Sequence, residues 1–366
     1  MTRRPDIFRP SRRVCGTTPL SQRGLSLIEL MVAMAIGLVM LATLASLYAS
    51  NSKTHNEFSK TSAQVENGRF AIQSIEQDVA QSGFYGRASL VASSPSYIDP
   101  DPCATAKTLL GFSASPTLTL PNGVVGMVYG AAVPSCLSSY NVAPNSEILI
   151  VRYASGDASA SVDTTNYFLQ LSQCSQDLAP LAFDTAASAF TLQTLACNGT
   201  KAEIRKYVER IYFLSTCDTC TPNSDNIPTL KVAELSNGAL VVSSLVQGIQ
   251  DIHYSYGIDR DQNGSPDCYV DDPTIDNTAN CGTISPTYSW VNPVTNWYNV
   301  TAVRVSVLAR NVDPTVGWTD TRSYSIGRTV VDGGAVADGP YNDTYKRHVY
   351  TTLARVWNTG GLREMQ

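Results

Sequence analysis

The pattern of hydrophobic and polar positions divides the chain into an apolar run near its start and a long mixed remainder. Residues 30–49 form 20 consecutive positions without a charged residue or a proline, which is the length that a helix needs to cross a bilayer. Residues 1–24 carry six arginines and one aspartate, and such a basic block stays on the cytoplasmic side of the membrane. The pattern therefore predicts a transmembrane helix over residues 25–49, with a cytoplasmic N-terminus and an exported remainder.

A helical pattern continues beyond the apolar run. Apolar residues recur at intervals of seven, with one i+3 neighbour, at Phe58, Val65, Ile72, Ile75 and Val79. This spacing puts an apolar stripe on one side of a helix, and the glycine at position 83 suits a C-cap. One helix is therefore expected over residues 25–83. A free stalk or a coiled coil is the alternative, but so short a stripe favours packing of this helix against the rest of the chain.

After residue 83 the chain is rich in Pro, Gly, Ser, Thr and Asn, and its short apolar runs are typical of strands. The runs cover residues 147–153, 167–171, 239–242, 249–258, 300–309 and 348–357. In the fourth run the even-numbered residues from Ile252 to Ile258 alternate onto one face, and His253 and Ser255 take the other. Asn237-Gly238 between two apolar runs predicts a hairpin turn.

The pattern leaves one segment ambiguous between a helix and a strand. Residues 203–214 have apolar positions that suit a helix at first and a strand later, and we favour a strand for the second half. In the last run, alternation predicts one face formed by Val349, Thr351, Leu353, Arg355 and Trp357. The predicted fold class is α+β: one long N-terminal helix, transmembrane in its first half, packed on an antiparallel β-sheet head with long loops. Residues 84–366 would form the head.

Composition and charge agree with export. Charged residues make up 16% of the chain and hydrophobic residues 43%, so a disordered polymer is excluded. The acidic balance excludes a nucleic-acid partner, because such proteins carry a basic face. Removal of residues 1–24 leaves 20 basic and 30 acidic residues and a net charge of −10. The exported part is therefore strongly acidic.

Cysteine usage indicates an oxidising compartment. One of the nine cysteines lies in the basic block, and the other eight suit disulfides. Eight cysteines allow 105 connectivities, and we take sequential pairing as the hypothesis: Cys103 with Cys136, Cys174 with Cys197, Cys217 with Cys220, and Cys268 with Cys281. The third pair forms a C-x-x-C motif, for which half a zinc site or a redox pair is the alternative.

The carboxylate of Glu29 at the start of the apolar run needs an explanation. A charge inside a membrane segment costs about 2.5–3.5 kcal/mol and usually has a partner. A secretory signal peptide would show a cleavage site after the apolar run, and a plain anchor leaves the glutamate unexplained. The stretch Gly24-Leu25-Ser26-Leu27-Ile28-Glu29 resembles the cleavage motif of type IV prepilins. The resemblance implies that a prepilin peptidase cuts between Gly24 and Leu25 and N-methylates Leu25, and that Glu29 pairs with the terminal amine of a neighbouring subunit.

Three stretches resemble the PilW family of minor pilins: residues 66–86, residues 248–259, and residues 300–310 with 346–358. The resemblance implies a protein that primes or caps a type IV pilus and supports twitching motility and adhesion. Implied partners are other minor pilins, the major pilin, a pilus-tip adhesin and the prepilin peptidase. The protein would be a single-pass inner-membrane protein with a periplasmic head, and extracellular after assembly.

One loop has the residues of a cation site. Oxygen-bearing side chains occur at Asp259, Asp261, Asn263, Ser265 and Asp267. This order matches the opening of a calcium loop, with Gly264 at the turn, but the residue at position twelve is Val270 and not the bidentate glutamate of an EF-hand. PilW-family sequences resemble this loop, which supports calcium. The alternative is a solvated Asx turn between two strands.

The sequence shows no catalytic motif, so we expect an assembly protein and not an enzyme. The three histidines lie on separate predicted elements, at His55, His253 and His348. Two other functions remain open. One is a large pseudopilin of type II secretion, which shares the leader and helix. The other is a membrane-anchored carbohydrate-binding or adhesive head, for which the 18 tyrosines offer aromatic surface that the sequence does not localise.

Overall fold

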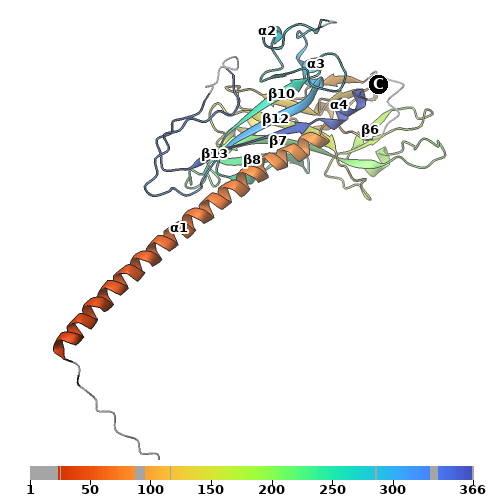
Figure 1. The fold of residues 1–366 in the computed structure, drawn as a ribbon. Coiled ribbons are helices and arrows are strands. Elements are labelled where there is room, and N and C mark those ends of the chain that lie inside the picture. The colour runs from red at the N-terminus through yellow and green to blue at the C-terminus, as the bar shows by residue number, and fades with distance from the viewer. Residues whose placement is uncertain are drawn as a thin grey trace, which may run out of the picture. The chain divides into compact units, whose positions relative to one another are not determined.

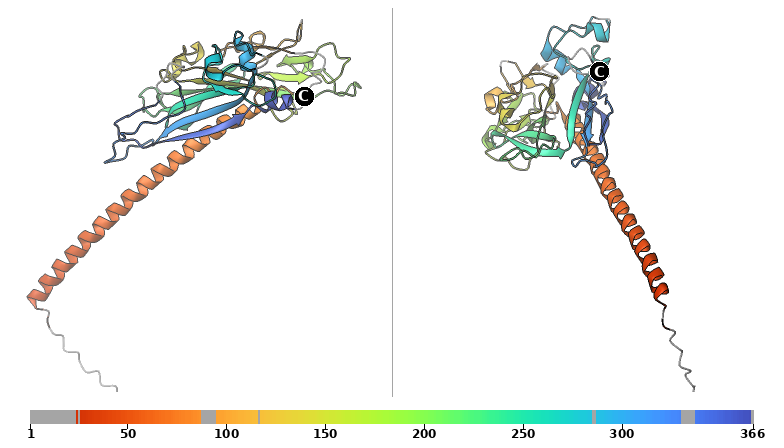
Figure 2. Two further views of the ribbon diagram at one scale, coloured as in Figure 1. Left: turned by 45° about the horizontal axis from the view of Figure 1, so that its top comes forward. Right: turned by 90° about the vertical axis from the view of Figure 1, so that its left-hand side faces the viewer.

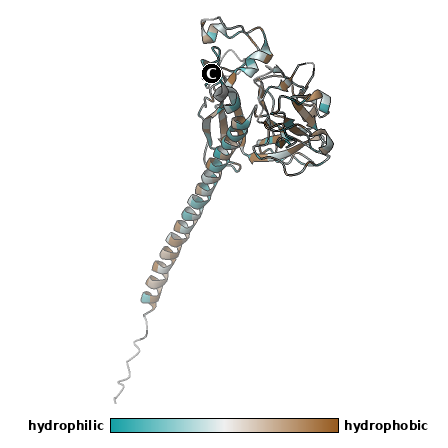
Figure 3. Cartoon of the chain, turned by 90° about the vertical axis from the view of Figure 1, so that its right-hand side faces the viewer, coloured by the Kyte–Doolittle hydropathy of each residue, from teal (hydrophilic) through white to brown (hydrophobic). Residues whose placement is uncertain are grey.

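The computed structural model describes residues 24, 26–86, 95–115, 117–284, 287–329 and 337–364. It divides into two units, residues 1–56 and 57–366, and helix α1 (Leu27–Gln81) runs from the first into the second. In the first unit the apolar side chains of α1 between Leu27 and Leu47 are exposed. Among the described residues α1 is the one helix long and apolar enough to cross a membrane. Figure 3 shows its apolar colouring concentrated in the first half and polar residues along the second.

The head contains two larger antiparallel sheets and one short parallel pair (Figure 1). Its strands are β1 (Ser96–Ile98), β2 (Thr119–Pro121), β3 (Val124–Met127), β4 (Ile148–Ala154), β5 (Phe168–Leu171), β6 (Leu181–Asp184), β7 (Ile204–Ser215), β8 (Thr229–Ser236), β9 (Ala239–Gln247), β10 (Ile249–Ile258), β11 (Cys268–Val270), β12 (Val300–Arg310) and β13 (Arg347–Arg355). Its short helices are α2 (Thr278–Cys281), α3 (Pro293–Tyr298) and α4 (Trp357–Arg363), with 3₁₀ turns at Lys107–Leu109, Ser135–Tyr140 and Ala187–Ala189.

The long strand β7 is the centre of the seven-stranded sheet. It pairs with β4, which pairs with β3, and also with β8 and β5, which continue to β9 and β6. The four-stranded sheet has the order β11-β10-β12-β13. One core joins the two sheets to α1: it includes Ile75 from the helix, Tyr212 from β7, and Tyr254 from β10. Figure 2 shows the second half of α1 running along both sheets. The α+β prediction is therefore confirmed, with two sheets in place of one.

The face of α1 that contacts the head differs from the predicted stripe. Ile75 and Val79 are buried as expected, but Phe58 is 74% exposed and Val65 36% exposed. The buried positions are instead Gln64, Gly68, Ala71, Ile75, Asp78 and Val79. They repeat at three and four residues, as one side of a helix requires. The prediction was wrong for the first half of the stripe because Gln64 and Gly68 face the sheets there.

Each of these unexpected positions has a partner in the sheets. Gln64 Nε2 donates to the carbonyls of Ala309, at 2.7 Å, and Lys346, at 3.0 Å. A Cβ atom on Gly68 would lie 2.3 Å from the ring of Tyr350 on β13. Position 68 therefore requires glycine, because the Tyr350 ring occupies the space that a side chain would need. Polar contact and close approach replace apolar packing over this part of the helix.

The carboxylate of Asp78 connects the end of α1 to the middle of the larger sheet. It accepts hydrogen bonds from the hydroxyls of Tyr153 on β4, at 2.9 Å, and Tyr212 on β7, at 2.5 Å. The Arg210 guanidinium lies 2.9 Å from Oδ1 and also contacts Glu234 on β8. Burial and the adjacent carboxylate raise the pKa of both tyrosines, so they remain protonated donors. Asp78 is 3% exposed, and its charge is compensated entirely by strands of the head.

A second buried ionic cluster joins the two sheets. His253 on β10 lies between two carboxylates: Nδ1 is 2.9 Å from Glu147, next to β4, and Nε2 is 3.2 Å from Asp271. Arg328 contacts Glu147 at 3.1 Å and Asp251 at 2.7 Å. Burial by itself lowers the pKa of His253, but the interactions with Asp271 and Glu147 outweigh it and raise this pKa to about 9. The imidazole is therefore a charged link at neutral pH.

Most strand predictions are confirmed, and two details are not. β10 has the expected bounds, β7 is a strand throughout, and Asn237-Gly238 forms the β8–β9 turn with both residues at positive φ. β13 ends at Arg355, and Trp357 begins α4. The face predicted from alternation that includes Leu353 is the more exposed one: Leu353 is 54% exposed while Ala354 is buried. The opposite face packs on α1, because Tyr350 meets Gly68 and the Thr352 hydroxyl donates to Glu76.

We predict that Asp78→Asn weakens the attachment of α1 to the head. The amide keeps the size but loses the charge that Arg210 and two hydroxyls satisfy, so the free energy of unfolding should fall by about 2–3 kcal/mol. The measurement is a urea titration of the full chain in detergent, in which tryptophan fluorescence reports unfolding. All four tryptophans, Trp290, Trp297, Trp318 and Trp357, lie in the head. Glu66→Gln, at an exposed position of α1, is the matched control. Equal midpoints for the two variants would contradict the prediction.

We also predict that the head loses stability between pH 7.5 and 9.5. A histidine whose pKa is raised stabilises the fold fully below its ordinary value of 6.5, and this contribution disappears as the pH rises through 9. Burial raises the pKa of Asp338, in the same cluster, to about 7. The pH range of this prediction therefore starts above 7, where the titration of Asp338 contributes little.

The melting temperature across this pH range is the measurement. It should fall in the unmodified protein and stay flat in His253→Gln. His55→Gln changes an exposed histidine of α1 and should behave like the unmodified protein. A slope of equal size in His253→Gln would show that another group causes the loss.

Candidate functional site

The start of α1 holds the predicted processing and assembly residues. Gly24 and Glu29 are described and exposed, whereas Leu25 and residues 1–23 lie outside the described residues. Glu29 Oε2 accepts a hydrogen bond from the Ser26 backbone N–H at 2.9 Å, and the Glu29 N–H donates to Ser26 Oγ at 3.2 Å. These two reciprocal bonds form a capping box. The S-x-x-E spacing that signals it is visible in the sequence at residues 26–29.

The capping box changes how the glutamate can be understood. In the separate chain Glu29 has a local role, because its carboxylate satisfies a free N–H and lies at the positive end of the helix dipole. Its side chain is nevertheless exposed among the apolar residues Leu27, Ile28 and Leu30. A cation brought by a neighbouring helix can therefore reach it without a change in the fold.

The predicted cation loop connects β10 to β11. Carboxylate oxygens of Asp259, Asp261 and Asp267 lie within 4.8 Å of one another. Asp259 is fully buried and accepts the backbone N–H groups of Asn263, at 3.1 Å, and Gly264, at 3.0 Å. Gly264 has a φ of +91°, and a Cβ there would lie 2.5 Å from the Gly360 carbonyl. The turn therefore requires glycine, and it brings three of the five predicted ligands together.

The other two predicted ligands serve the loop itself. Asn263 Oδ1 accepts from the Ser265 N–H at 2.8 Å, and Asn263 Nδ2 donates to Asp261 at 2.9 Å. The hydrogen bond that the structure shows for Ser265 is the one from its backbone N–H to Asn263. Asp267 Oδ2 accepts the Arg260 N–H at 2.7 Å. The loop thus closes by Asx-type turns, and the three carboxylates are the oxygen ligands that it offers to a cation.

A residue far along the chain completes this loop. Arg363 Nη1 lies 2.8 Å from Asp259 Oδ2, and Nη2 donates to Asn299 at 2.7 Å. Arg363 is in α4, so the C-terminal helix provides the countercharge for the buried Asp259. A separation of 104 residues hid this contact from sequence reasoning. The carboxylate cluster therefore already holds one protein cation, and two of its three aspartates are exposed.

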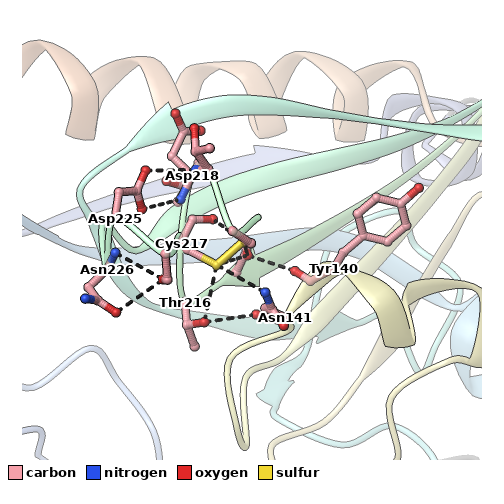
Figure 4. The surroundings of a disulfide bond; sticks show 12 residues. Tyr140, Asn141, Thr216, Cys217, Asp218, Asp225 and Asn226 are labelled. Carbon is pink, nitrogen blue, oxygen red and sulfur yellow. Dashed lines mark hydrogen bonds between the residues drawn. A yellow bond between two sulfur atoms is a disulfide. The ribbon is translucent and has the colours of Figure 1, made fainter. Parts of the chain in front are cut away.

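Four disulfides join the cysteines that are neighbours in sequence: Cys103–Cys136, Cys174–Cys197, Cys217–Cys220 and Cys268–Cys281. The last one holds the segment that follows the cation loop. The C-x-x-C pair forms a bridge within one tight turn (Figure 4). Both oxygens of Asp225 accept backbone N–H groups of this turn, from Asp218 at 3.0 Å and Thr219 at 2.8 Å. This motif is thus a structural clip at the end of β7.

The three histidines do not form a shared site. His55 is exposed on α1, His348 is exposed on β13, and His253 is buried between its two carboxylates. Acidic side chains flank both ring nitrogens of His253, Glu147 at Nδ1 and Asp271 at Nε2. The arrangement suits an ionic link between elements, as described for the fold, and not a base that activates a nucleophile.

Comparisons with known protein families match both parts of the chain. The model described as "Type IV Pilus-assembly protein W" matches residues 211–358, from β7 to the first residues of α4. The model described as "Prokaryotic N-terminal methylation motif" matches residues 20–45, which include Gly24 and Glu29. The stretch 66–86, which also resembled the family, lies outside both matches. Neither the curated proteins nor the solved structures gave a match to the chain.

The two matches fit the structure at the places where function is expected. The methylation motif falls on the exposed apolar start of α1, and the PilW match contains the whole four-stranded sheet together with the cation loop. Membrane anchoring and association with a pilus follow from this combination. The two matches together support a type IV pilus minor pilin of the PilW family.

Proposed function

We propose that this minor pilin primes the assembly of a type IV pilus or caps its tip. The observation that carries the proposal is that one chain combines a helix with exposed apolar side chains and a large, loop-rich head. The helix presents apolar side chains that other pilin helices can cover within the membrane. The head has long clipped loops that suit an end position better than a repeated one. Its partners would be other minor pilins, the major pilin and a tip adhesin, and its assembly would support twitching motility and adhesion.

Processing is the first step of this proposal. A prepilin peptidase cleaves between Gly24 and Leu25 and methylates the new terminal amine of Leu25. Until then the protein is held in the inner membrane with its N-terminus in the cytoplasm and its head in the periplasm, as the arginines of the leader require. After incorporation into a pilus the head is extracellular. The role is structural, and no chemical reaction is assigned to the head.

Assembly then depends on the charge of Glu29. The terminal amine of one subunit pairs with this carboxylate on another, which offsets the cost of placing either charge among lipid tails. The same side chain also caps its own helix, so the two roles must be separated by mutation. Glutamine serves in a capping box as well as glutamate does, whereas it cannot pair with an ammonium group as an anion.

We predict that Glu29→Gln reduces surface piliation and twitching while leaving cleavage intact. Ser26→Ala, which removes the cap but keeps the charge, should assemble far better than Glu29→Gln. Gly24→Val, which puts a branched side chain at the cleavage position, should leave the leader attached. Mass spectrometry of the N-terminal peptide reports cleavage and methylation, and electron microscopy reports piliation. Normal piliation in Glu29→Gln, or a mature N-terminus other than methylated Leu25, would reject the proposal.

We also propose that the loop over residues 259–267 binds calcium. Three converging carboxylates and a turn fixed by Gly264 support this, since oxygen ligands on a loop suit a hard cation. Asp259, Asp261 and Asp267 would hold the ion. Because Arg363 already compensates Asp259 and position twelve has no acid, binding should be weak, in the range of extracellular modules, about 10⁻⁴–10⁻³ M.

The predicted result is that millimolar calcium raises the melting temperature of the full chain in detergent. Asp261→Asn removes an exposed ligand and should abolish this shift. The matched control is Asp313→Asn, an exposed aspartate outside the loop, which should keep it. Magnesium tests whether the effect is one of general ionic strength. If calcium gave no shift in the unmodified protein, or an equal shift in Asp261→Asn, the loop would be a structural turn only.

A further inference from the structure

One cavity on the head is lined by none of the candidate carboxylate ligands, and the pilin function assigns it no role. Its volume is about 750 Å³, which is within the range of small-molecule sites. Its walls come from the end of α1, β1, the β2–β3 turn, α3 and α4. Residues that converge on it from these elements include Gly83, Tyr97, Asn122, Thr295, Tyr298 and Thr359. Five separate parts of the chain thus build one concavity.

The aromatic side of the cavity is held firmly. Tyr97 on β1 and Tyr298 on α3 stack with ring centroids 4.0 Å apart. Trp297, the neighbour of Tyr298, is buried and meets the ring of Tyr256 edge-on at 4.7 Å. The helix α3 is itself fixed, because the buried Asn296 donates to the carbonyls of Pro273 and Trp290. An aromatic surface with fixed geometry needs no ordering when a ligand binds.

The polar side of the cavity carries neutral groups. Hydroxyl and carboxamide side chains line it at Ser96, Asn122, Asn292, Thr295, Asn358 and Thr359. Asn122 is 1% exposed, and its Nδ2 donates to Asp99, at 2.6 Å, and to the Val294 carbonyl, at 2.9 Å. Its Oδ1 has no hydrogen-bond partner among the residues described. This buried acceptor has the capacity for one further donor, such as a hydroxyl group.

Charge excludes the ionic ligand classes. The only charged side chain among the described lining residues is Arg363. Its two terminal nitrogens are already bound to Asp259 and Asn299, and its guanidinium lies 4.9 Å from the centre of the Tyr298 ring. The cavity therefore offers no free cation to a carboxylate or phosphate, and no anion to an amine. What remains is a ligand with an apolar face and several neutral hydroxyl groups.

We propose that this cavity binds a neutral saccharide unit. The C–H face of a sugar ring would lie on the Tyr97–Tyr298 surface, since aromatic rings combine apolar area with a polar tip. The sugar hydroxyls would form hydrogen bonds with the neutral amide and hydroxyl side chains of the cavity. These side chains contain both donors and acceptors. The head would then contribute to recognition of glycans in addition to its place in the pilus, and this role does not depend on priming.

The test uses the full chain in detergent on an array of neutral and sialylated oligosaccharides. The strongest neutral glycan is then titrated while the tryptophan fluorescence is followed, because Trp297 lines the cavity. We expect binding of neutral glycans that the free sugar competes away. Thr295→Arg, at an exposed position of α3, should fill the cavity and weaken binding at least tenfold. Tyr97→Leu should weaken it by removal of half of the stacked pair.

Val291→Arg is the matched control, because this residue is 89% exposed and does not line the cavity. It should bind like the unmodified protein, and the melting temperatures of the variants show whether each remains folded. Three results would overturn the proposal: no glycan bound by the unmodified protein, binding restricted to sialylated glycans, or unchanged affinity in both Thr295→Arg and Tyr97→Leu.

Discussion

A buried carboxylate on a helix that must also cross a membrane imposes the main constraint on this head. Asp78 contributes nothing to apolar packing, and it is stable in the core only because Tyr153, Arg210 and Tyr212 satisfy it. Those three residues occupy β4 and β7, the central strands of the larger sheet. The charge therefore specifies which strands meet the helix and in what register, since a shift of one residue would turn the tyrosines to the other face.

The same helix meets two environments, and its sequence changes accordingly. Up to about the middle of α1 the side chains are apolar on every side, as lipid or other pilin helices require. Toward the head only one narrow side is buried, and it is unusual in using Gln64, Gly68 and Asp78. Polar anchors suit a helix that is attached to a head at one end only. They fix position by directed hydrogen bonds, where apolar side chains would permit the helix to slide.

The sequence was most informative where a signal is local. The apolar run, the long strands and the Asn237-Gly238 turn follow from periodicity or from short spacing, and the structure contains each element. The prepilin motif is supported by the match to the methylation motif. Prediction failed where the partner is distant. Nothing near Phe58 or Val65 reveals that Gln64 binds the carbonyls of β12 and of Lys346, nor does the spacing around Leu353 show that Tyr350 fills the place left by Gly68.

The candidate sites repeat this division. The acidic spacing in residues 259–267 correctly brought three carboxylates together, but it also assigned a ligand role to Asn263, whose amide closes the loop instead. Arg363 was invisible in this reasoning, although it is the residue that joins the two sites. Arg363 contacts the loop at Asp259, and it contacts the cavity wall at the face of the Tyr298 ring.

This shared residue has a chemical consequence for both proposals. A cation bound at Asp259 would share this carboxylate with Arg363, whose Nη1 lies 2.8 Å from Oδ2, and would weaken that ion pair. Once released, Arg363 would retain Asn299 and the Tyr298 ring, and the cavity wall would gain an uncompensated positive charge. The two proposals therefore meet at Arg363, and glycan binding should be measured at a fixed calcium concentration.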